Sequence, residues 1–274
     1  ETESSEYCQT SEINTAAQSL FQRSNNAEGE NTWLFQLDFS RAISKDHKYE
    51  IGIRSSLREI RNDFIVEEST DNFSWRELGQ WTNDFSYDED IHAIYAIYGN
   101  TIKKFSYQAG LRTEYSDIKT RLLKSENGGL NARRYTNLFP SGHINYNFSE
   151  KSAAQLSYSR RVRRPRFWDL NPFFTFSDNR NFFSGNPNLN PEFTDSYELG
   201  QIQYWEDLSL SSSIFYRKTD QSIQRVLTLE RSEINTLRMP VNMGTVQDIG
   251  LDISASYSGI KWLRLDANCN IFRN

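Results

Sequence analysis

The alternation that decides the fold is clearest in residues 105–115, which read FSYQAGLRTEY. The odd-numbered positions carry mostly apolar or aromatic side chains, namely Phe105, Tyr107, Ala109, Leu111 and Tyr115. The even-numbered positions carry small or polar ones, namely Ser106, Gln108, Gly110, Arg112 and Glu114. Successive side chains of an extended strand point to opposite faces, so this pattern predicts a strand with one apolar and one polar face.

The same period of two recurs along the chain. Alternating runs lie at residues 33–39, 49–54, 85–97, 144–148, 156–158, 208–216, 249–257 and 263–271. In residues 85–97 the pattern predicts one apolar face made of Phe85, Tyr87, Ile91, Ala93, Tyr95 and Ile97. Several runs reach the roughly 9–11 residues that a tilted strand needs to cross a bilayer. Around Gly200 the apolar positions shift by one residue, which predicts a β-bulge there.

The links between these runs alternate in length. Short polar turns lie at residues 44–48, 99–104, 149–152, 205–207 and 258–261, and longer polar stretches lie at 59–83, 117–136, 163–192 and 218–241. Outer-membrane barrels show this asymmetry, because their periplasmic turns are tight and their extracellular loops are long. A soluble antiparallel sandwich also has alternating strands, but it has no reason to sort its links in this way. The pattern therefore predicts an all-β, antiparallel transmembrane β-barrel.

Aromatic residues gather beside the short turns, namely Tyr98, Phe105, Phe148, Tyr204, Trp205, Tyr257 and Trp262. Aromatic side chains prefer the membrane–water boundary, where the ring is buried and its polar edge stays hydrated. Cross-strand packing in any β protein is the alternative. We favour the boundary interpretation, because these residues collect at the short-turn ends of the runs.

Composition narrows the class of protein. Hydrophobic residues make up 37% of the chain and aromatic residues 14%, and the first figure is below the roughly 45–50% of a typical globular domain. The net charge of −5 argues against nucleic acid as the main partner. The sequence contains no run of about 18 apolar residues, so it predicts no transmembrane helix. Cys8 and Cys269 leave open one long-range disulfide or two free thiols.

Both ends of the sequence resemble cuts. The chain opens with ETESSEYCQT, which lacks the pattern of a signal peptide, and its last residues still alternate. We therefore expect residues 1–274 to be an internal piece of a longer protein. The runs predict ten strands, preceded by the tail of another at about 12–23. An arc of about 10–11 strands from a larger barrel is favoured over a closed ten-stranded barrel.

The most distinctive stretch is residues 157–199, SYSRRVRRPRFWDLNPFFTFSDNRNFFSGNPNLNPEFTDSYEL. A strand ending in Tyr-Ser-Arg-Arg leads to Arg-Pro and Asn-Pro, and a Gly-Asn-Pro-x-Leu-x-Pro-Glu segment opens the next strand. The residues that carry this motif are Tyr158, Ser159, Arg160, Arg161, Arg164, Pro165, Asn171, Pro172, Gly185, Asn186, Pro187, Leu189, Pro191 and Glu192. The motif resembles the late-barrel signature of TonB-dependent outer-membrane receptors.

The resemblance implies a barrel of about twenty-two strands that encloses a plug domain. Such receptors import a scarce ligand, such as a siderophore complex, cobalamin, an oligosaccharide or a peptide. The energy comes from an inner-membrane TonB complex that contacts a short N-terminal box. The sequence holds neither the plug, the box nor the terminal aromatic strand. We therefore expect residues 1–274 to be a partial barrel domain, with the plug domain and both ends of the barrel domain absent.

The motif is expected to shape a long outward loop. Proline ends strand pairing and glycine permits tight turns, so we assign loop shaping to Arg164, Pro165, Asn171, Pro172, Gly185, Asn186, Pro187, Pro191 and Glu192. Exposed aromatics on a loop often mark a binding surface. The expected small-molecule, glycan or peptide ligand is therefore assigned to Trp168, Phe173, Phe174, Arg180, Asn181, Phe182 and Phe183. Alternatively these rings fold back over the barrel mouth or contact the plug.

Two charged groups have competing interpretations. Arg160, Arg161 and Arg163 are expected to pair with lipopolysaccharide phosphates or with neighbouring carboxylates, and we favour both over an anionic ligand. The acidic residues of segment 84–90 are interpreted as a solvated strand end, in preference to a site for a divalent cation.

Signals for catalysis are weak. The chain contains no HExxH, CxxC, GxSxG, P-loop or GxGxxG motif, so no enzyme activity, cofactor or metal site is predicted. His47 is expected on the surface in a short turn, and His92 and His143 on the face toward the barrel lumen. The sequence therefore predicts a receptor in the outer membrane. A passive barrel channel, an assembly factor and a soluble β-sandwich binding module are the alternatives.

Overall fold

The computed structural model describes residues 2–13, 16–79, 81–123, 129–172, 175–178, 181–230 and 235–274. It describes the backbone alone at residues 2–13, 16–20, 175–178, 181, 182, 228–230 and 235. In these residues one short helix, α1 (Phe167–Leu170), accompanies a fold that is otherwise made of strands. None of the helical structure described is long and apolar enough to cross a membrane.

The strands in the first half of the chain are β1 (Thr2–Ile13), β2 (Ala16–Ala42), β3 (His47–Ser69), β4 (Arg76–Glu77), β5 (Asn83–Ile102), β6 (Phe105–Leu122) and β7 (Leu130–Ser149). Those in the second half are β8 (Ser152–Arg163), β9 (Thr175–Asp178), β10 (Asn181–Phe183), β11 (Glu192–Tyr204), β12 (Leu208–Asp220), β13 (Ile223–Glu230), β14 (Asn235–Asn242), β15 (Thr245–Ile260) and β16 (Leu263–Arg273). Residues 12–23 are therefore not the tail of one strand: β1 ends and β2 begins within them.

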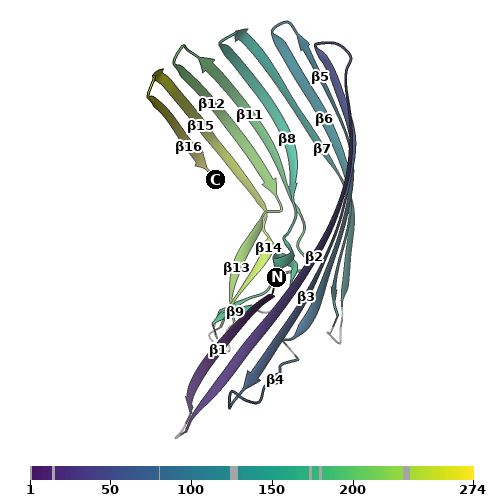
Figure 1. Ribbon diagram of the computed structural model, residues 1–274, viewed down its shortest axis with the longest axis vertical. Coiled ribbons are helices and arrows are strands. Elements are labelled where there is room, and N and C mark those ends of the chain that lie inside the picture. The colour runs from purple at the N-terminus through teal and green to yellow at the C-terminus, as the bar shows by residue number, and fades with distance from the viewer. Residues whose placement is uncertain are drawn as a thin grey trace.

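Within the described residues, twelve strands form one antiparallel sheet in the order β1-β2-β3-β5-β6-β7-β8-β11-β12-β15-β16, with β4 paired to β3. The sheet is strongly curved, and β1 and β16 lie at its two ends (Figure 1). An open arc of antiparallel strands confirms the predicted fold class. The soluble sandwich is wrong, because Tyr95, Leu111 and Leu251 lie in β5, β6 and β15 of one continuous sheet.

The links sort to the two ends of the strands as predicted. The short turns lie at the upper end in Figure 1, and the long links, including β13 and β14, lie at the lower end. The stretches 59–83 and 117–136 are less loop-like than predicted, because β3 continues to Ser69 in the first, while β6 continues to Leu122 and β7 begins at Leu130 in the second. The pairing of β6 with β7 continues as far as Arg121 opposite Leu130. Polar strands can continue there, because neighbouring strands satisfy the backbone hydrogen bonds.

Strand registers define the two faces of the sheet. Leu37, Ile53, Ile94 and Leu138 lie in one row across β2, β3, β5 and β7, and their exposed fractions are 68%, 52%, 57% and 56%. The adjacent row, on the opposite face, contains Asp38, Gly52, Tyr95 and Arg112. The convex face is therefore apolar and exposed, whereas the concave face is largely polar.

The predicted apolar face of residues 85–97 is wrong. His92, Ile94 and Ala96 lie on the convex face, while Phe85, Tyr87 and the other odd-numbered residues lie on the concave face. Both faces of β5 carry apolar residues, because Phe85 and Tyr87 are covered from inside by a loop that the pattern could not anticipate. His92 is accordingly on the convex face, whereas His143, which pairs with Gln108, is on the concave face as predicted.

The β-bulge predicted at Gly200 is also wrong. In the described strands β11 and β12 the ladder runs without a shift from Phe193 opposite Asp220 to Tyr204 opposite Ser209. Two glutamines, Gln201 and Gln203, therefore take convex positions, and Ile202 faces inward beside Ser211. The sequence pattern breaks here because side-chain polarity changes, while the backbone register does not.

Candidate functional site

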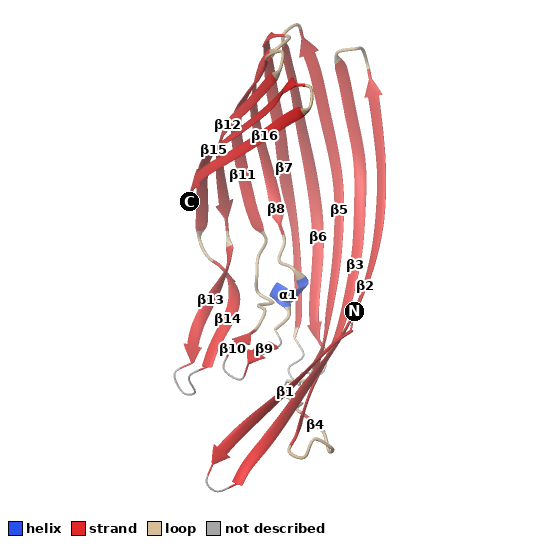
Figure 2. Ribbon diagram, turned by 60° about the vertical axis from the view of Figure 1, so that its left-hand side comes forward, coloured by secondary structure: helices blue, strands red, loops and turns tan. Residues whose placement is uncertain are grey.

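The long link between β8 and β11 (residues 164–191) folds against the concave face of the extended strands. Phe167, Leu170 and Leu189 are 4%, 5% and 2% exposed. They form a cluster with apolar residues of the sheet, namely Ile60, Phe64, Val66, Phe85, Tyr87 and Ile118. The rings of Phe85 and Phe167 lie 5.4 Å apart between centroids. Figure 2 shows α1, in blue, at the end of the sheet where the long links lie.

A buried ion pair anchors the start of this link. Arg164 Nη2 donates to Glu114 Oε2 at 2.5 Å and to Ser116 Oγ at 3.2 Å. Glu114 also accepts from Arg112 Nε at 2.6 Å, and it is only 6% exposed. Burial acts to lower the pKa of the Arg164 guanidinium, but the hydrogen bond to Glu114 and its charge raise that pKa above its ordinary value. Arg164 therefore stays charged and holds the link to β6.

Gly185 lets the two halves of the link approach each other. Its backbone N–H donates to Asn171 O at 2.8 Å, and a Cβ atom at this position would meet the same carbonyl oxygen at 2.3 Å. Asn186 N donates to Asp169 O at 2.7 Å, which fastens the segment to α1. Glycine is thus required here for space. Gly185, Asn186 and Asn171 thus meet at one point of the link, and their role in shaping it stays a prediction.

Two side chains of β7 hold the other side of the link. Asn131 Nδ2 donates to Pro187 O at 2.8 Å. Arg133 Nη1 donates to Leu189 O and, at 2.9 Å, to Asn190 Oδ1. Sequence reasoning missed Asn131, Arg133 and Glu114 as partners of the motif. Only Glu114 carried a usable signal, because its run placed it on the polar face.

Prolines complete the fit of the link to the sheet. Pro165, Pro187 and Pro191 lie around a small cavity of about 20 Å³ that Tyr87, Ile118 and Tyr135 also line. Pro172 accepts a hydrogen bond from Ser184 Oγ at 3.0 Å. These rings stiffen a path that makes no regular ladder with the main sheet. The link is therefore a packed element and not an open loop.

The predicted ligand-contact residues are only partly placed. Trp168 lies in α1 and is 41% exposed, with its ring 5.3 Å from that of Phe167. Phe183 is half-buried, and Arg225 stands 5.4 Å from its ring centroid. Asn181 and Phe182 belong to the backbone of β10, and their side chains lie outside the described part. Outside the described residues altogether lie Phe173, Phe174 and Arg180.

The basic cluster meets carboxylates of the next strand. Arg163 Nε lies 2.5 Å from Glu192 Oε2, and Arg160 Nη1 lies 3.7 Å from Asp195 Oδ2. Glu192 is 5% exposed, so its charge is screened little by solvent. Arg161 faces the concave side and is exposed. Neighbouring carboxylates were one of the partners expected for this cluster.

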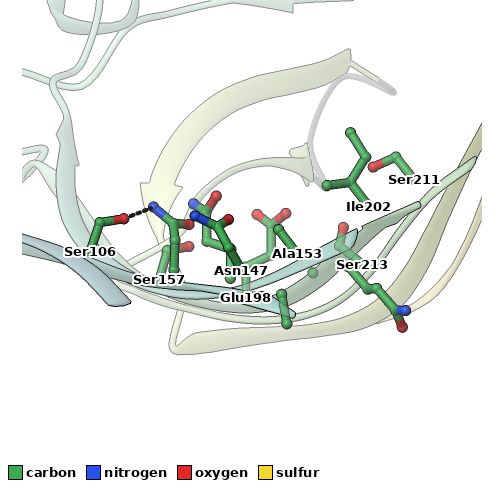
Figure 3. A pocket seen from close by; sticks show the side chains of 13 residues that line it. Ser106, Asn147, Ala153, Ser157, Glu198, Ile202, Ser211 and Ser213 are labelled. Atoms are coloured by element: carbon green, nitrogen blue, oxygen red, sulfur yellow. Dashed lines mark hydrogen bonds between the residues drawn. The ribbon is translucent and has the colours of Figure 1, made fainter. Parts of the chain in front are cut away.

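A polar hollow of about 340 Å³ opens on the concave face, closer to the short turns. Its lining comes from five neighbouring strands, with Ser106, Asn147, Ser157, Glu198 and Ser213 among the residues labelled in Figure 3. Asn145 Nδ2 donates to Ser106 Oγ at 3.5 Å (Figure 3). Hydroxyl and amide groups dominate, so this surface suits water or a hydrated partner more than an apolar ligand.

The histidines and acidic residues of the described chain do not converge. No group of three or more His, Cys, Asp or Glu residues in the described part could hold a metal ion. His47 lies at the start of β3, and its Nδ1 is 3.3 Å from Tyr98 Oη. His92 Nδ1 lies 2.9 Å from Ser55 Oγ on the convex face. Cys269 is a free, exposed cysteine in β16.

A comparison with known protein families identifies the family to which this curved sheet belongs. A model of the outer membrane protein beta-barrel family matches residues 1–274. The chain belongs to this family. No curated protein matches the sequence.

Solved structures of other members of the barrel fold resemble this chain at low identity. The ferric yersiniabactin uptake receptor FyuA from Yersinia pestis has a TM-score of 0.64 and 12% identity, over 99% of this chain and 42% of that one. The FrpB iron transporter from Neisseria meningitidis has a TM-score of 0.58 and 14% identity, over 99% and 43%. The alcaligin outer membrane receptor FauA from Bordetella pertussis has a TM-score of 0.53 and 16% identity, over 99% and 46%. The chain thus spans less than half the length of these three structures.

Membership of the family places the chain in the outer membrane. The exposed apolar residues of the convex face are therefore the lipid-facing surface of a barrel, and the concave face is turned toward its interior. The border of the lipid-facing surface moves along the strands: the convex apolar residues reach Leu57 in β3 and Tyr115 in β6, but only Tyr216 in β12. The strands of a barrel are tilted and cross the membrane obliquely. The border of the lipid-facing surface is therefore expected to shift from one strand to the next.

Proposed function

We propose that this chain is part of the barrel of a TonB-dependent receptor, which takes up a scarce ligand across the outer membrane. The ligand class is a siderophore complex, cobalamin, an oligosaccharide or a peptide. Similar structures, an uptake receptor and an iron transporter among them, support transport in preference to catalysis. On this proposal residues 1–274 are a partial barrel domain, with the plug domain elsewhere in the protein.

The observation that carries the proposal is the packed link between β8 and β11. Its Arg164 is held by Glu114 at 2.5 Å, and its Leu189 is buried on the inner face of the sheet. A receptor needs an ordered surface over the opening of its barrel, and a packed link can supply one. The motif that resembles TonB-dependent receptors forms this same link.

We assign the ligand-facing surface to the aromatic part of the link. Trp168 and Phe183 are the members whose side chains are described, and both retain exposed area. Phe173, Phe174, Arg180, Asn181 and Phe182 belong to the same proposed surface by position in the sequence alone.

We also propose that lipopolysaccharide is a partner of the barrel rim. Arg160, Arg161 and Arg163 lie where β8 leaves the sheet, and two of them already have carboxylate partners in Asp195 and Glu192. Arg160 is the member best placed for a phosphate, since its register puts it on the convex face with Tyr158 and Tyr197, and guanidinium binds phosphate oxygens in pairs. The inner-membrane TonB complex is proposed to act through a region outside this chain.

Uptake measured with and without energy coupling tests this function. The full-length gene is expressed in a host that lacks its own receptors, and the accumulation of a panel of labelled siderophores, cobalamin, oligosaccharides and peptides is followed. We expect saturable uptake of one class, abolished when the host lacks its TonB complex. Uptake that persists without the TonB complex would identify a passive channel. An outer membrane with assembly defects in the gene deletion would instead support an assembly factor.

A further inference from the structure

Two long links that are far apart in the sequence share one small sheet. β10, in the link between β8 and β11, pairs in parallel with β14, in the link between β12 and β15. Immediately after β10, Ser184 N donates to Arg238 O at 3.0 Å. No hairpin turn joins β10 to β14, because they belong to two separate links. Their parallel pairing therefore requires both links to be held in place.

Asn242 makes a second connection at the other end of these links. Asn190 N donates to Asn242 Oδ1 at 2.8 Å, and Asn242 Nδ2 donates to Asn190 O at 2.9 Å. The same Nδ2 donates to Gln221 O at 2.8 Å, and Gln221 has a φ of 57°. One amide side chain therefore holds the end of the first link and the beginning of the second.

Two further contacts join the same pair of links. Asn186 Nδ2 donates to Pro240 O at 3.1 Å, and Pro240 is among the most completely buried residues of the chain. The backbone N–H of Ile223, at the start of β13, donates to Glu192 Oε1. The connection thus extends from residue 184 of one link to Glu192 at the start of β11, and it touches both strands of the β13–β14 hairpin in the other link.

We propose that the described residues of the links 164–191 and 221–244 form a single structural unit, with Asn242 as the residue that couples them. Side chains of the sheet hold the unit in place: Arg164 binds Glu114 of β6, and Arg133 of β7 binds Asn190. Opening of one link therefore requires opening of the other. A contact made by a ligand on either link is transmitted to both, and this role in ligand capture rests on the transport function proposed above.

Hydrogen exchange of the full-length protein in detergent, without ligand, tests the coupling independently of transport. In Asn242→Ala we expect amides of both 184–191 and 223–242 to exchange about tenfold faster, because the variant loses three hydrogen bonds, two of which join the links. Asn188→Ala is the matched control, because Asn188 lies in the same segment, is exposed and makes no hydrogen bond to β13 or β14 in the described residues. Its exchange should stay within about twofold of the parent.

A second variant separates the two kinds of contact. Asn242→Asp keeps an acceptor for Asn190 N but places a carboxylate oxygen against the carbonyl oxygens of Asn190 and Gln221, so exchange in both segments should rise at least as much as in the alanine variant. Unchanged exchange in β5 and β6 shows that the barrel is folded. Faster exchange in 223–242 alone would overturn the proposal, because the links would then open separately. Unchanged exchange in both segments would equally overturn it, since Asn242 would not couple them.

Discussion

Replacement of Arg164 by Met should release the link between β8 and β11 from the barrel. Removal of one partner of a fully buried ion pair costs about 3–5 kcal/mol, because the remaining charge is left without compensation. Here the Arg164 side chain is 18% exposed, and Glu114 keeps Arg112 as a partner at 2.6 Å. The remaining carboxylate is therefore partly compensated. We expect a loss of about 2 kcal/mol in the free energy that holds the link closed, below the range for an isolated pair.

A loss of this size is measurable as amide exchange. Since 1.4 kcal/mol corresponds to a factor of ten, the amides that close with the link should exchange about thirtyfold faster. The amides to follow are Asn171 N, which donates to Phe167 O at 3.0 Å, and Gly185 N, which donates to Asn171 O at 2.8 Å. Exchange is followed by mass spectrometry on the full-length protein in detergent, with the exposed Arg161→Met as the control.

A result within about threefold of the parent protein would refute this reasoning, because apolar packing alone would then be holding the link. The Arg161→Met control should leave Asn171 and Gly185 unchanged. Equal acceleration in both variants would show a general effect of lost positive charge and would also contradict the anchoring role of Arg164.

Three further predictions test the two faces of the sheet. Gly250→Ala should lower the unfolding midpoint in denaturant by an amount equivalent to about 1–3 kcal/mol, because the new Cβ would lie 2.4 Å from Phe215 Cζ and 2.7 Å from a backbone oxygen; an unchanged midpoint would contradict the register of β15. Leu138→Arg should lower the free energy of unfolding in lipid by about 2–4 kcal/mol, whereas Gln108→Arg on the inner face should be tolerated. Equal effects of the two substitutions on the folded fraction would reject the assignment of faces. Cys269 should react with an apolar maleimide in liposomes and resist a membrane-impermeant one, as mapped by peptide mass; the opposite preference would place β16 the other way round.

The alternation of the sequence was enough to predict the architecture wherever one face meets lipid. In β6 the odd-numbered residues predicted as apolar, such as Leu111 and Tyr115, are 49% and 43% exposed on the convex face. Lipid selects apolar side chains on one side and water selects polar ones on the other, so the sequence records both environments. The order of the strands follows from the same pattern, because each run pairs with the next one along the chain.

The pattern failed where a strand leaves the lipid. Phe85 and Tyr87 are 1% and 2% exposed on the concave face, because Phe167 covers them from inside. An apolar residue there records contact with the link between β8 and β11, and not contact with lipid. From sequence alone the two causes are indistinguishable, since a shift of one residue exchanges the two faces of a strand. His92 was misplaced for the same reason.

The residues that bind the motif in the link between β8 and β11 could not be predicted from the sequence, for a different reason. Gly185 and Arg164 stood out by type and position, but Glu114 and Asn131 lie some fifty residues from the groups they bind. Contacts at that separation depend on the register of the strands that lie between the two groups. Asn242 carried no local signal at all, because an asparagine beside a turn is common in any loop.

The strands differ in length, and this difference explains why the long links have to pack against the inner face of the longer strands. β3 continues well beyond its last lipid-facing residue, from Leu57 to Ser69, whereas β12 ends at Asp220, soon after Tyr216. The inner face of the longer strands would therefore lack a partner on the opposite side. An uncovered cluster around Ile60 and Phe85 would expose apolar surface to water, which is unfavourable in proportion to its area. The long links on the β8–β15 side cover that surface, so the motif that holds them in place is a requirement of the barrel's own shape as well as of any ligand.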